Sequence, residues 1–370
     1  MRFDLAHAGD DEALRALFRA NPMDGDVRVT LEREPSFFLA SSIEGHGHQT
    51  IVARRESGAG LLGAGSRAVI TAFVNGEPRS VGYLSQLRID QDQPSRRRLL
   101  AGGYRKLREL HGDGQVAFYL TTIVRDNRPA RRFLEAGLAG LPVYRRLDDV
   151  VTLVLPTARP SRRARRLATG AEVRAATPGR LPAIVGCLQR NGRRYQFARC
   201  WGVADIEDSE RTRGLEVEDF LYVSEGGAVR GCVAVWDQRA FKQTVVRSFS
   251  PWLRRVRPAF NVVAPLLRQP RLPSPGRTLG TVFASHLAVD DDRTDIVVAL
   301  LEEARTSARR RGADYLVLGL ARRHPLLEPV KRLFDHREYV SVLYQVFWEK
   351  DAPGLPEVGE LVPHVEVATL

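Results

Sequence analysis

The stretch from Val81 to Gly137 constrains the fold more than any other part of this sequence. Residues 81–90 alternate in polarity and suit a half-buried pleated surface, which predicts a strand. Four later residues recur at the spacing of one helical face and predict an amphipathic helix: Leu100, Tyr104, Leu107 and His111. Residues 116–124 are almost continuously apolar, as expected for a strand that helices cover on both faces.

A second helix is predicted to close this unit. Asp126 and Asn127 can cap it, Pro129 is tolerated in its first turn, and Gly137 is placed to end it. The unit is therefore strand, helix, strand, helix. Its crossover should be right-handed, which makes the two strands parallel.

This order, with a basic turn before the first helix and Asn-x-x-Ala at 127–130, resembles the cofactor-binding half of the GNAT superfamily of acyl-CoA N-acyltransferases. In that family a glycine-containing turn holds the pyrophosphate of coenzyme A on backbone N–H groups. Here residues 94–98 contain no glycine, so their three arginine side chains are expected to supply that contact.

The first 156 residues follow the element order of the resembled family. The sequence predicts an opening strand, an acid-capped helix near Leu14, and a second helix from Pro35 to about Gly45. An antiparallel meander and two closing segments should then complete the sheet: 50–54, 66–74, 80–90, 143–146 and 149–155. Asn75-Gly76 is a strong hairpin signal within the meander.

The second half repeats the first. Ser285 to Asp290 stands 200 positions after Ser85 to Asp90 and matches it at serine, leucine and aspartate. A helical stripe follows at the corresponding place: Val297, Leu300, Leu301, Ala304 and Ala308. We therefore predict an α/β fold of mixed twisted sheets flanked by helices, as two GNAT-like domains in tandem.

The predicted domain boundaries follow from this repeat and from composition: a first GNAT-like domain at 1–156 that binds acyl-CoA, a basic linker at 157–168, a second GNAT-like domain at 169–350, and a C-terminal tail at 351–370.

An inserted segment, 238–277, has no counterpart in the first half. It contains eight arginines, one lysine and no acid, interleaved with aromatic residues. It could be a basic flap over an anionic ligand, a surface-binding amphipathic segment, or an element that packs the domains together. We expect it to pack against the first domain and to cover part of the cofactor cleft.

Composition excludes several classes of protein. No run of about 18 apolar residues is present, and the acidic N-terminus does not resemble a signal peptide, so we expect a cytoplasmic protein without a membrane span. The three cysteines form no CxxC, and no metal site is implied. The net charge of +12 is mostly arginine; without a nucleic-acid-binding motif, an anionic cofactor explains it better than DNA or RNA.

The resemblance implies which residues contact coenzyme A. Leu87, Arg88 and Ile89 end the first strand of the unit and offer backbone groups. The side chains of Arg96, Arg97 and Arg98 face the pyrophosphate, and Asn127 lies beside the pantetheine arm. The alternatives are a solvated helix end for the arginines and a simple N-cap for Asn127.

Catalytic residues are harder to assign, because the family's usual general-acid tyrosine falls at Leu134 in this chain. Tyr144 on the following strand is the substitute, unless it is a core tyrosine. Glu34 lies in the region that the family uses for the acceptor and is the candidate base, unless it only complements a helix N-terminus.

The predicted function is transfer of an acetyl group from acetyl-CoA to a primary amine, on a small molecule or peptide, directly in a ternary complex. The alternative is an inactive acyl-CoA-binding or interaction protein of the same fold, and a nucleic-acid binder is the third reading. The first half is the expected cofactor site, because Asp290 to Asp295 places four carboxylates where the first half has arginines, and His324 replaces Asn127.

Overall fold

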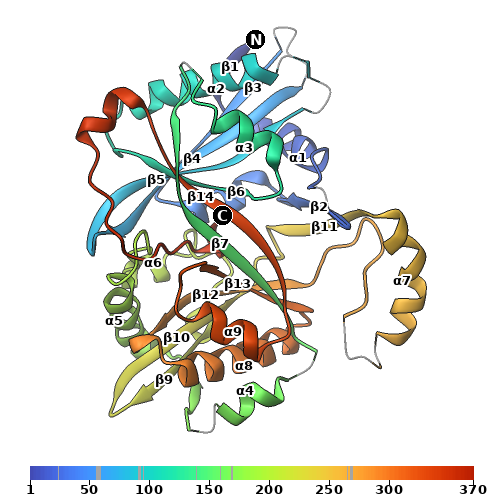
Figure 1. Cartoon of the computed structure of the whole chain (residues 1–370), viewed down its shortest axis with the longest axis vertical. Helices are drawn as coiled ribbons and strands as arrows, with labels where there is room; N and C mark the ends of the chain where they lie inside the picture. The colour runs from blue at the N-terminus through green and yellow to red at the C-terminus, as the bar shows by residue number, and fades with distance from the viewer. Residues whose placement is uncertain are drawn as a thin grey trace.

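The structure is a computed structural model that describes every residue except 24, 56–59, 91, 92, 95, 139, 159, 168, 169, 265 and 267–269. Figure 1 shows two lobes stacked along the long axis, with the C-terminus between them. Across the residues described, twelve strands form a single sheet that runs through both lobes. The fold is therefore a mixed α/β sheet flanked by helices, as predicted.

The elements of the first half are β1 (Arg2–Leu5), α1 (Asp11–Arg19), β2 (Val27–Glu32), β3 (Gly47–Arg54), β4 (Leu61–Val74), β5 (Glu77–Ile89), α2 (Arg96–His111), β6 (Tyr119–Val124), α3 (Arg128–Leu134) and β7 (Val143–Pro156). Those of the second half are α4 (Arg162–Leu167), β8 (Val173–Ala175), α5 (Leu181–Gly192), α6 (Val203–Glu207), β9 (Phe220–Glu225), β10 (Ala228–Trp236), β11 (Gln243–Phe249), α7 (Pro251–Val263), β12 (Thr281–Val289), α8 (Thr294–Arg310), β13 (Tyr315–Ala321), α9 (Leu327–Leu333) and β14 (Arg337–Phe347).

The two halves exchange strands at the centre of the sheet. The strand order is β1-β3-β4-β5-β6-β14-β7-β13-β12-β10-β9-β8. The C-terminal strand β14 is antiparallel to both β6 and β7, while β7 also pairs with β13. The segments 143–146 and 149–155, predicted to complete the first sheet, form the single strand β7, which joins the sheet but pairs with β14 and β13 and not with β6. The boundaries 1–156, 157–168, 169–350 and 351–370 stay predictions, and residues 159, 168 and 169 lie outside the described part.

Two predictions from local sequence in the first half had different outcomes, one confirmed and one wrong. The hairpin between β4 and β5 turns at Asn75 and Gly76, which have φ of 53° and 82°. The predicted helix from Pro35 is wrong, because this stretch forms two short 3-10 turns, η2 (Phe37–Ala40) and η3 (Ser42–Glu44). The hydroxyls of Ser41 and Ser42 donate to backbone carbonyls within these turns, which competes with regular helix.

The internal repeat is confirmed in detail. β5, α2, β6 and α3 correspond to β12, α8, β13 and α9, and both strand pairs β5/β6 and β12/β13 are parallel. Each first strand also carries a β-bulge on its antiparallel side, at Gln86 (φ 58°) and His286 (φ 52°), which stand 200 positions apart. A non-glycine residue at positive φ is uncommon, so a shared bulge marks a shared architecture.

The core of the second lobe lies on both faces of its sheet. The predicted stripe of α8 is buried against one face, where Val297, Leu300 and Leu301 are 0% exposed. α5 covers the other face with Leu181, Ile184 and Leu188. Packing on both faces explains why these strands have few polar residues.

The inserted segment forms a strap that reaches the first half. β11 pairs antiparallel with β2 in a separate two-stranded sheet, from Gln243 opposite Glu32 to Phe249 opposite Val27. The prediction that the inserted segment packs against the first half is thus confirmed. Its coverage of the cofactor cleft stays a prediction. Residues 265 and 267–269 of the segment lie outside the described residues. None of the described helices has both the length and the apolar character to cross a bilayer.

Candidate functional site

The parallel strands β5 and β6 separate soon after they meet. They pair only from Gly82 opposite Tyr119 to Tyr83 opposite Leu120 in the described residues. At the point of separation, Thr121 Oγ1 donates to the carbonyl of Leu84 at 2.9 Å. Beyond it, residues 84–89 and 122–124 are half-buried or exposed although they lie in central strands. The first half therefore presents an open strand edge next to the bulge at Gln86.

The predicted cofactor residues of β5 end this open edge. Leu87 is 42% exposed, and the guanidinium of Arg88 lies over the ring of Phe18, 5.1 Å from its centroid. Because that side chain turns toward α1, the contact predicted for Arg88 rests on its backbone. Ile89 is half-buried beside the start of the basic turn.

Arg96, Arg97 and Arg98 form the exposed first turn of α2, and that turn contains no acidic residue. Positive side chains at a helix N-terminus are uncommon, because the helix dipole already places partial positive charge there. An anion bound at this end would offset both the positive charge of the arginine side chains and the partial positive charge of the helix dipole. Residues 91, 92 and 95 of the predicted turn lie outside the described residues.

Asn127 is the N-cap of α3, where its Oδ1 accepts from the N–H of Ala130 at 3.3 Å. The capping role that the sequence offered as an alternative is confirmed. Asn127 is exposed at the end of β6, on the strand that diverges from β5. Its contact with a pantetheine arm stays a prediction.

Glu34 lies at a contact between α1 and the strap. Its carboxylate oxygens accept from Arg15 at 2.5 Å and Arg19 at 3.0 Å, and its backbone exchanges two hydrogen bonds with the side chain of Gln243. Both oxygens therefore already have a cationic partner. Its role as a base stays a prediction, and a structural role in joining α1 to β11 is present.

Tyr144 lies on β7, which β14 separates from β6. Two strand spacings place it about 10 Å from β6 in the sheet. Its hydroxyl is hydrogen-bonded to that of Tyr104, and burial raises its pKa well above the usual value. The structure thus does not bring Tyr144 and Glu34 together as neighbours, and the acid role of Tyr144 stays a prediction.

Glu44 is a residue that sequence reasoning missed. It is 1% exposed, and its carboxylate accepts from Ser85 Oγ at 2.5 Å and Gln86 Nε2 at 3.3 Å, which holds the bulge of β5. It also forms a buried ion pair with Arg33. Burial alone would raise the pKa of Glu44, but Arg33 and His48 lower it far below its ordinary value. The ion pair with Arg33 therefore favours the carboxylate form of Glu44, and its hydrogen bonds position the bulge.

The equivalent place in the second half is filled by the chain itself. The N–H of His286, the bulge residue of β12, donates to Glu366 Oε2 at 2.8 Å. Val367 lies so close to Gly319 on β13 that a Cβ there would be 2.2 Å from its Cγ1. Residues 284–286, 288, 289 and 318–321 are all buried. The C-terminal segment thus occupies the gap between β12 and β13.

The carboxylates before α8 are also already bound. Asp290 accepts from Arg190 at 2.9 Å and from Asn191 at 2.8 Å, and Asp292 accepts from Tyr195 at 2.5 Å. This end of α8 therefore has its negative charge supplied from within the chain, which disfavours a phosphate there.

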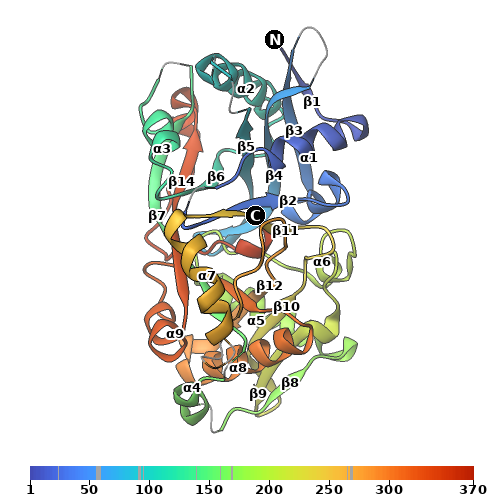
Figure 2. The same cartoon turned by 90° about the vertical axis from the view of Figure 1, so that its right-hand side faces the viewer.

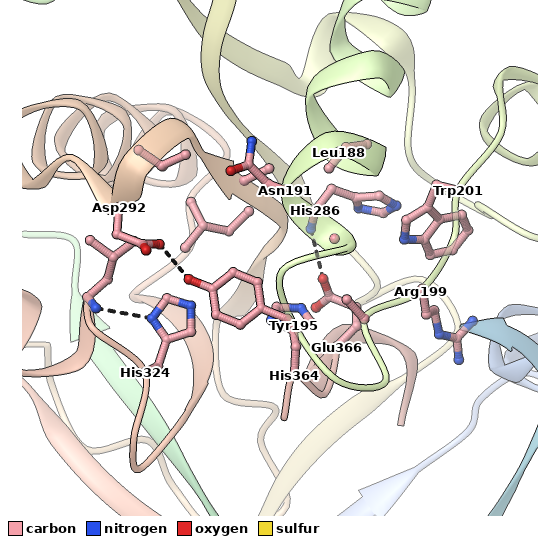
Figure 3. Close-up of a pocket in the computed structure, with 16 residues that line it drawn as sticks. Leu188, Asn191, Tyr195, Arg199, Trp201, His286, Asp292, His324, His364 and Glu366 are labelled. Carbon is pink, nitrogen blue, oxygen red and sulfur yellow. Dashed lines mark hydrogen bonds between the residues drawn. The ribbon is translucent and has the colours of Figure 1, made fainter. Parts of the chain in front are cut away.

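A small cavity remains beside the filled gap, with a volume of about 40 Å³ (Figure 3). His286, His324, His364 and Tyr195 line it. A water molecule needs roughly 10–15 Å³ of such a cavity, so there is room for a few waters and none for pantetheine. Within the described residues, no group of His, Cys, Asp or Glu is arranged to hold a metal ion.

These histidines should make the fold sensitive to acid. Burial lowers the pKa of His286 and His324 to about 3 and that of His364 to about 4. Below about pH 6.5 the unfolded chain takes up protons that the folded chain does not, so stability falls as pH decreases from 6.5 to 4. His324 Nδ1 accepts from the N–H of Leu326 at 3.1 Å, which the Oδ1 of asparagine can replace.

We expect His324→Asn to reduce the loss of unfolding free energy between pH 6.5 and pH 4 by on the order of 3 kcal/mol. Urea unfolding of the parent and the variant at a series of pH values measures this loss of unfolding free energy. His7→Asn is the matched control, since the side chain of His7 is 70% exposed and its Nδ1 also accepts from a backbone N–H. Parallel pH profiles for both variants and the parent would contradict the expectation.

Known proteins resemble this chain in structure but not in sequence. Neither the family models nor the curated proteins that were compared match the sequence. Solved structures do match. Saccharomyces cerevisiae N-myristoyltransferase with bound myristoyl-CoA is 12% identical, with TM-score 0.58 over 93% of this chain and 82% of that chain.

Two further matches carry GCN5-related names. An N-acetyltransferase from Sphaerobacter thermophilus is 14% identical, with TM-score 0.50 over 87% of this chain and 83% of that one. A glucosamine N-acetyltransferase region in a fungal GH3 β-N-acetylglucosaminidase is 12% identical, with TM-score 0.59 over 94% of this chain and 38% of that one. The likeness shows the tandem GNAT-like fold.

Proposed function

We propose that this chain is an N-acyltransferase that takes its acyl group from acyl-CoA bound at the open edge of β5. The main support for this proposal is the difference in access to the strand edge between the two repeats. Residues 84–89 and 122–124 of the first repeat are accessible, whereas Glu366 and Val367 fill the same place in the second. Structural neighbours named for N-acyl transfer support the same class.

The residues at this edge suit coenzyme A. Backbone groups of residues 87–89 that do not face β4 would pair with the amides of the pantetheine arm as an added strand would. The carbonyl of Leu87 would first have to release Arg88 Nη1, which donates to it at 2.9 Å. Arg96, Arg97 and Arg98 can neutralise the diphosphate by charge-assisted hydrogen bonds. The bulge that Glu44 holds at Gln86 would direct a backbone N–H toward the thioester oxygen as negative charge develops there.

Bound acyl-CoA would supply a thioester, which a neutral amine attacks as the C–S bond breaks and the departing sulfur gains a proton. We propose that the acyl group is acetyl and the acceptor is a primary amine of a small molecule or peptide. Glu34 is the proposed base and Tyr144 the proposed acid. In this structure the carboxylate of Glu34 accepts from Arg15, and the hydroxyl of Tyr144 is hydrogen-bonded to that of Tyr104. These hydrogen bonds must rearrange when the acceptor binds if the two residues are to act as base and acid.

Free-thiol release from acetyl-CoA and longer acyl-CoAs with a panel of amines tests the activity. We expect turnover that depends on both substrates, and roughly 100-fold lower kcat for Glu34→Gln and for Tyr144→Phe. Glu12→Gln, on the exposed face of α1, is the matched control for the carboxylate. Unchanged kcat in either variant would remove that residue from the mechanism without affecting the assignment of the acyl-CoA site.

The second candidate is an acyl-CoA-binding protein without turnover. It is favoured by Leu134, which is 6% exposed at the position of the family's acid, and by the two arginine partners of Glu34. Saturable binding of coenzyme A with no thiol release for any acyl-CoA and amine would decide for it.

A further inference from the structure

Helix α7 stands apart from the body of the protein. It follows β11 in the strap, and Figure 1 shows it projecting to the right of the lobes, away from the main sheet. In Figure 2 that side faces the viewer, and α7 lies in front of the lobes. Ser250 caps its N-terminus, where Oγ accepts from the N–H of Leu253 at 3.4 Å. The helix is thus a defined element with a capped start.

The inner face of α7 is fixed by specific contacts. Leu253 and Phe260 pack on a small core that contains Val246, Phe249 and Leu272. Asn261 exchanges two hydrogen bonds of 2.9 Å with the backbone of Leu272, and Arg257 donates to the same carbonyl at 3.1 Å. These contacts hold the helix in one rotation about its axis, so the opposite face is presented to the surroundings.

That outer face carries large apolar side chains, with Arg255 among them. Trp252 is 67% exposed, Val262 74% and Val263 41%, and Leu266 just beyond the helix is 83% exposed. Trp252 and Val263 are eleven residues apart, close to three helical turns, and so share one side. Large apolar side chains gathered at one exposed place on a protein commonly mark an interaction surface.

The charge of the inserted segment itself has one sign, although Asp26 lies next to the start of α7, where its carbonyl accepts from the N–H of Ser250 at 2.8 Å. Residues 238–277 contain eight arginines, one lysine and no acid, and Arg254 and Arg255 are exposed on α7 itself. A projecting helix with tryptophan and aliphatic side chains beside arginines has the composition of a helix that lies in a membrane interface. Anionic headgroups match the cationic rim, and the acyl boundary accepts the apolar side chains.

We propose that the outer face of α7 docks onto the surface of bilayers that contain anionic lipids, with Trp252, Val262, Val263 and Leu266 entering the headgroup region and Arg254 and Arg255 on the phosphates. This interaction is independent of the proposed acyl transfer. Vesicle binding is measured without acyl-CoA, so the two hypotheses can fail separately.

Tryptophan fluorescence gives a direct readout. Of the four tryptophans, Trp201, Trp236 and Trp348 are 4%, 0% and 8% exposed, so only Trp252 can change its environment at a surface. With the full chain, we expect a blue shift and co-sedimentation on phosphatidylcholine vesicles that contain phosphatidylglycerol, and neither on phosphatidylcholine alone. Trp252→Phe should bind but lose the blue shift.

Two paired variants locate the surface. Arg254→Glu with Arg255→Glu is expected to weaken binding to the anionic vesicles by more than about tenfold. Arg79→Glu with Arg180→Glu makes the same charge change at exposed positions elsewhere and should bind normally. Trp252→Ser with Leu266→Ser should also lose binding while its melting temperature stays unchanged.

Three results would overturn the proposal. The first is no co-sedimentation of the parent chain with either vesicle. The second is equal weakening by both charge-reversal pairs, which would reflect net charge alone. The third is concentration-dependent self-association in analytical ultracentrifugation that the α7 variants abolish, because this face would then bind a second copy of the chain.

Discussion

Replacing Arg96, Arg97 and Arg98 together with alanine is expected to weaken the binding of coenzyme A by roughly 100- to 1,000-fold. A hydrogen bond to a charged group contributes about 1.5–3 kcal/mol, and each 1.4 kcal/mol is a factor of ten. Because these side chains are exposed, each contact should lie near the lower end, at about 1.5–2 kcal/mol, and loss of two such contacts then accounts for the expected range. The three side chains are exposed at the start of α2, so the substitution should leave the fold intact. Calorimetric titration of coenzyme A into the full chain measures the change.

The matched control removes three exposed arginines elsewhere: Arg79, Arg180 and Arg254. It makes the same change in net charge and should bind coenzyme A as the parent does. Affinity should also fall with added salt in the parent more steeply than in the α2 variant, since fewer charge contacts remain there to be screened. Equal affinities for parent and α2 variant would place the diphosphate elsewhere.

Glu44→Gln is expected to lower the free energy of unfolding by about 3–5 kcal/mol. The substitution leaves the guanidinium of Arg33, which is 3% exposed, without its carboxylate partner, and an uncompensated buried charge is strongly destabilising. Urea or thermal unfolding measures the loss. Arg33→Met with Glu44→Gln should recover most of it, because no unpaired charge then stays buried.

The control for Glu44 is Glu12→Gln, which makes the same chemical change on the exposed face of α1 and should alter stability by less than about 0.5 kcal/mol. If Glu44→Gln unfolded at the same denaturant concentration as this control, the buried ion pair would contribute nothing.

The repeat was predictable because short stretches of matching sequence specify it in both halves. Ser85 and Ser285 gave the register, and the bulges at Gln86 and His286 follow it. The hairpin at Asn75 was predictable for the same reason, since a tight turn needs residues that accept positive φ.

Features that depend on distant partners were not predictable. The alternation in residues 340–347 indicates a strand, yet nothing in it specifies insertion between β6 and β7. Glu44 is one acid among many until the fold brings Arg33 and Ser85 around it. Likewise, Glu366 and Val367 close the second repeat through contacts with residues 80 and 48 positions away, His286 and Gly319.

The position of β14 has a consequence for biosynthesis. A ribosome releases β6 and β7 long before it makes β14, the strand that lies between them. During that interval the backbone groups of β6 that later face β14 have no ladder partner, and an unpaired apolar strand is a template for aggregation. The first lobe can therefore complete its sheet only after β14, near the end of the polypeptide, has been synthesised.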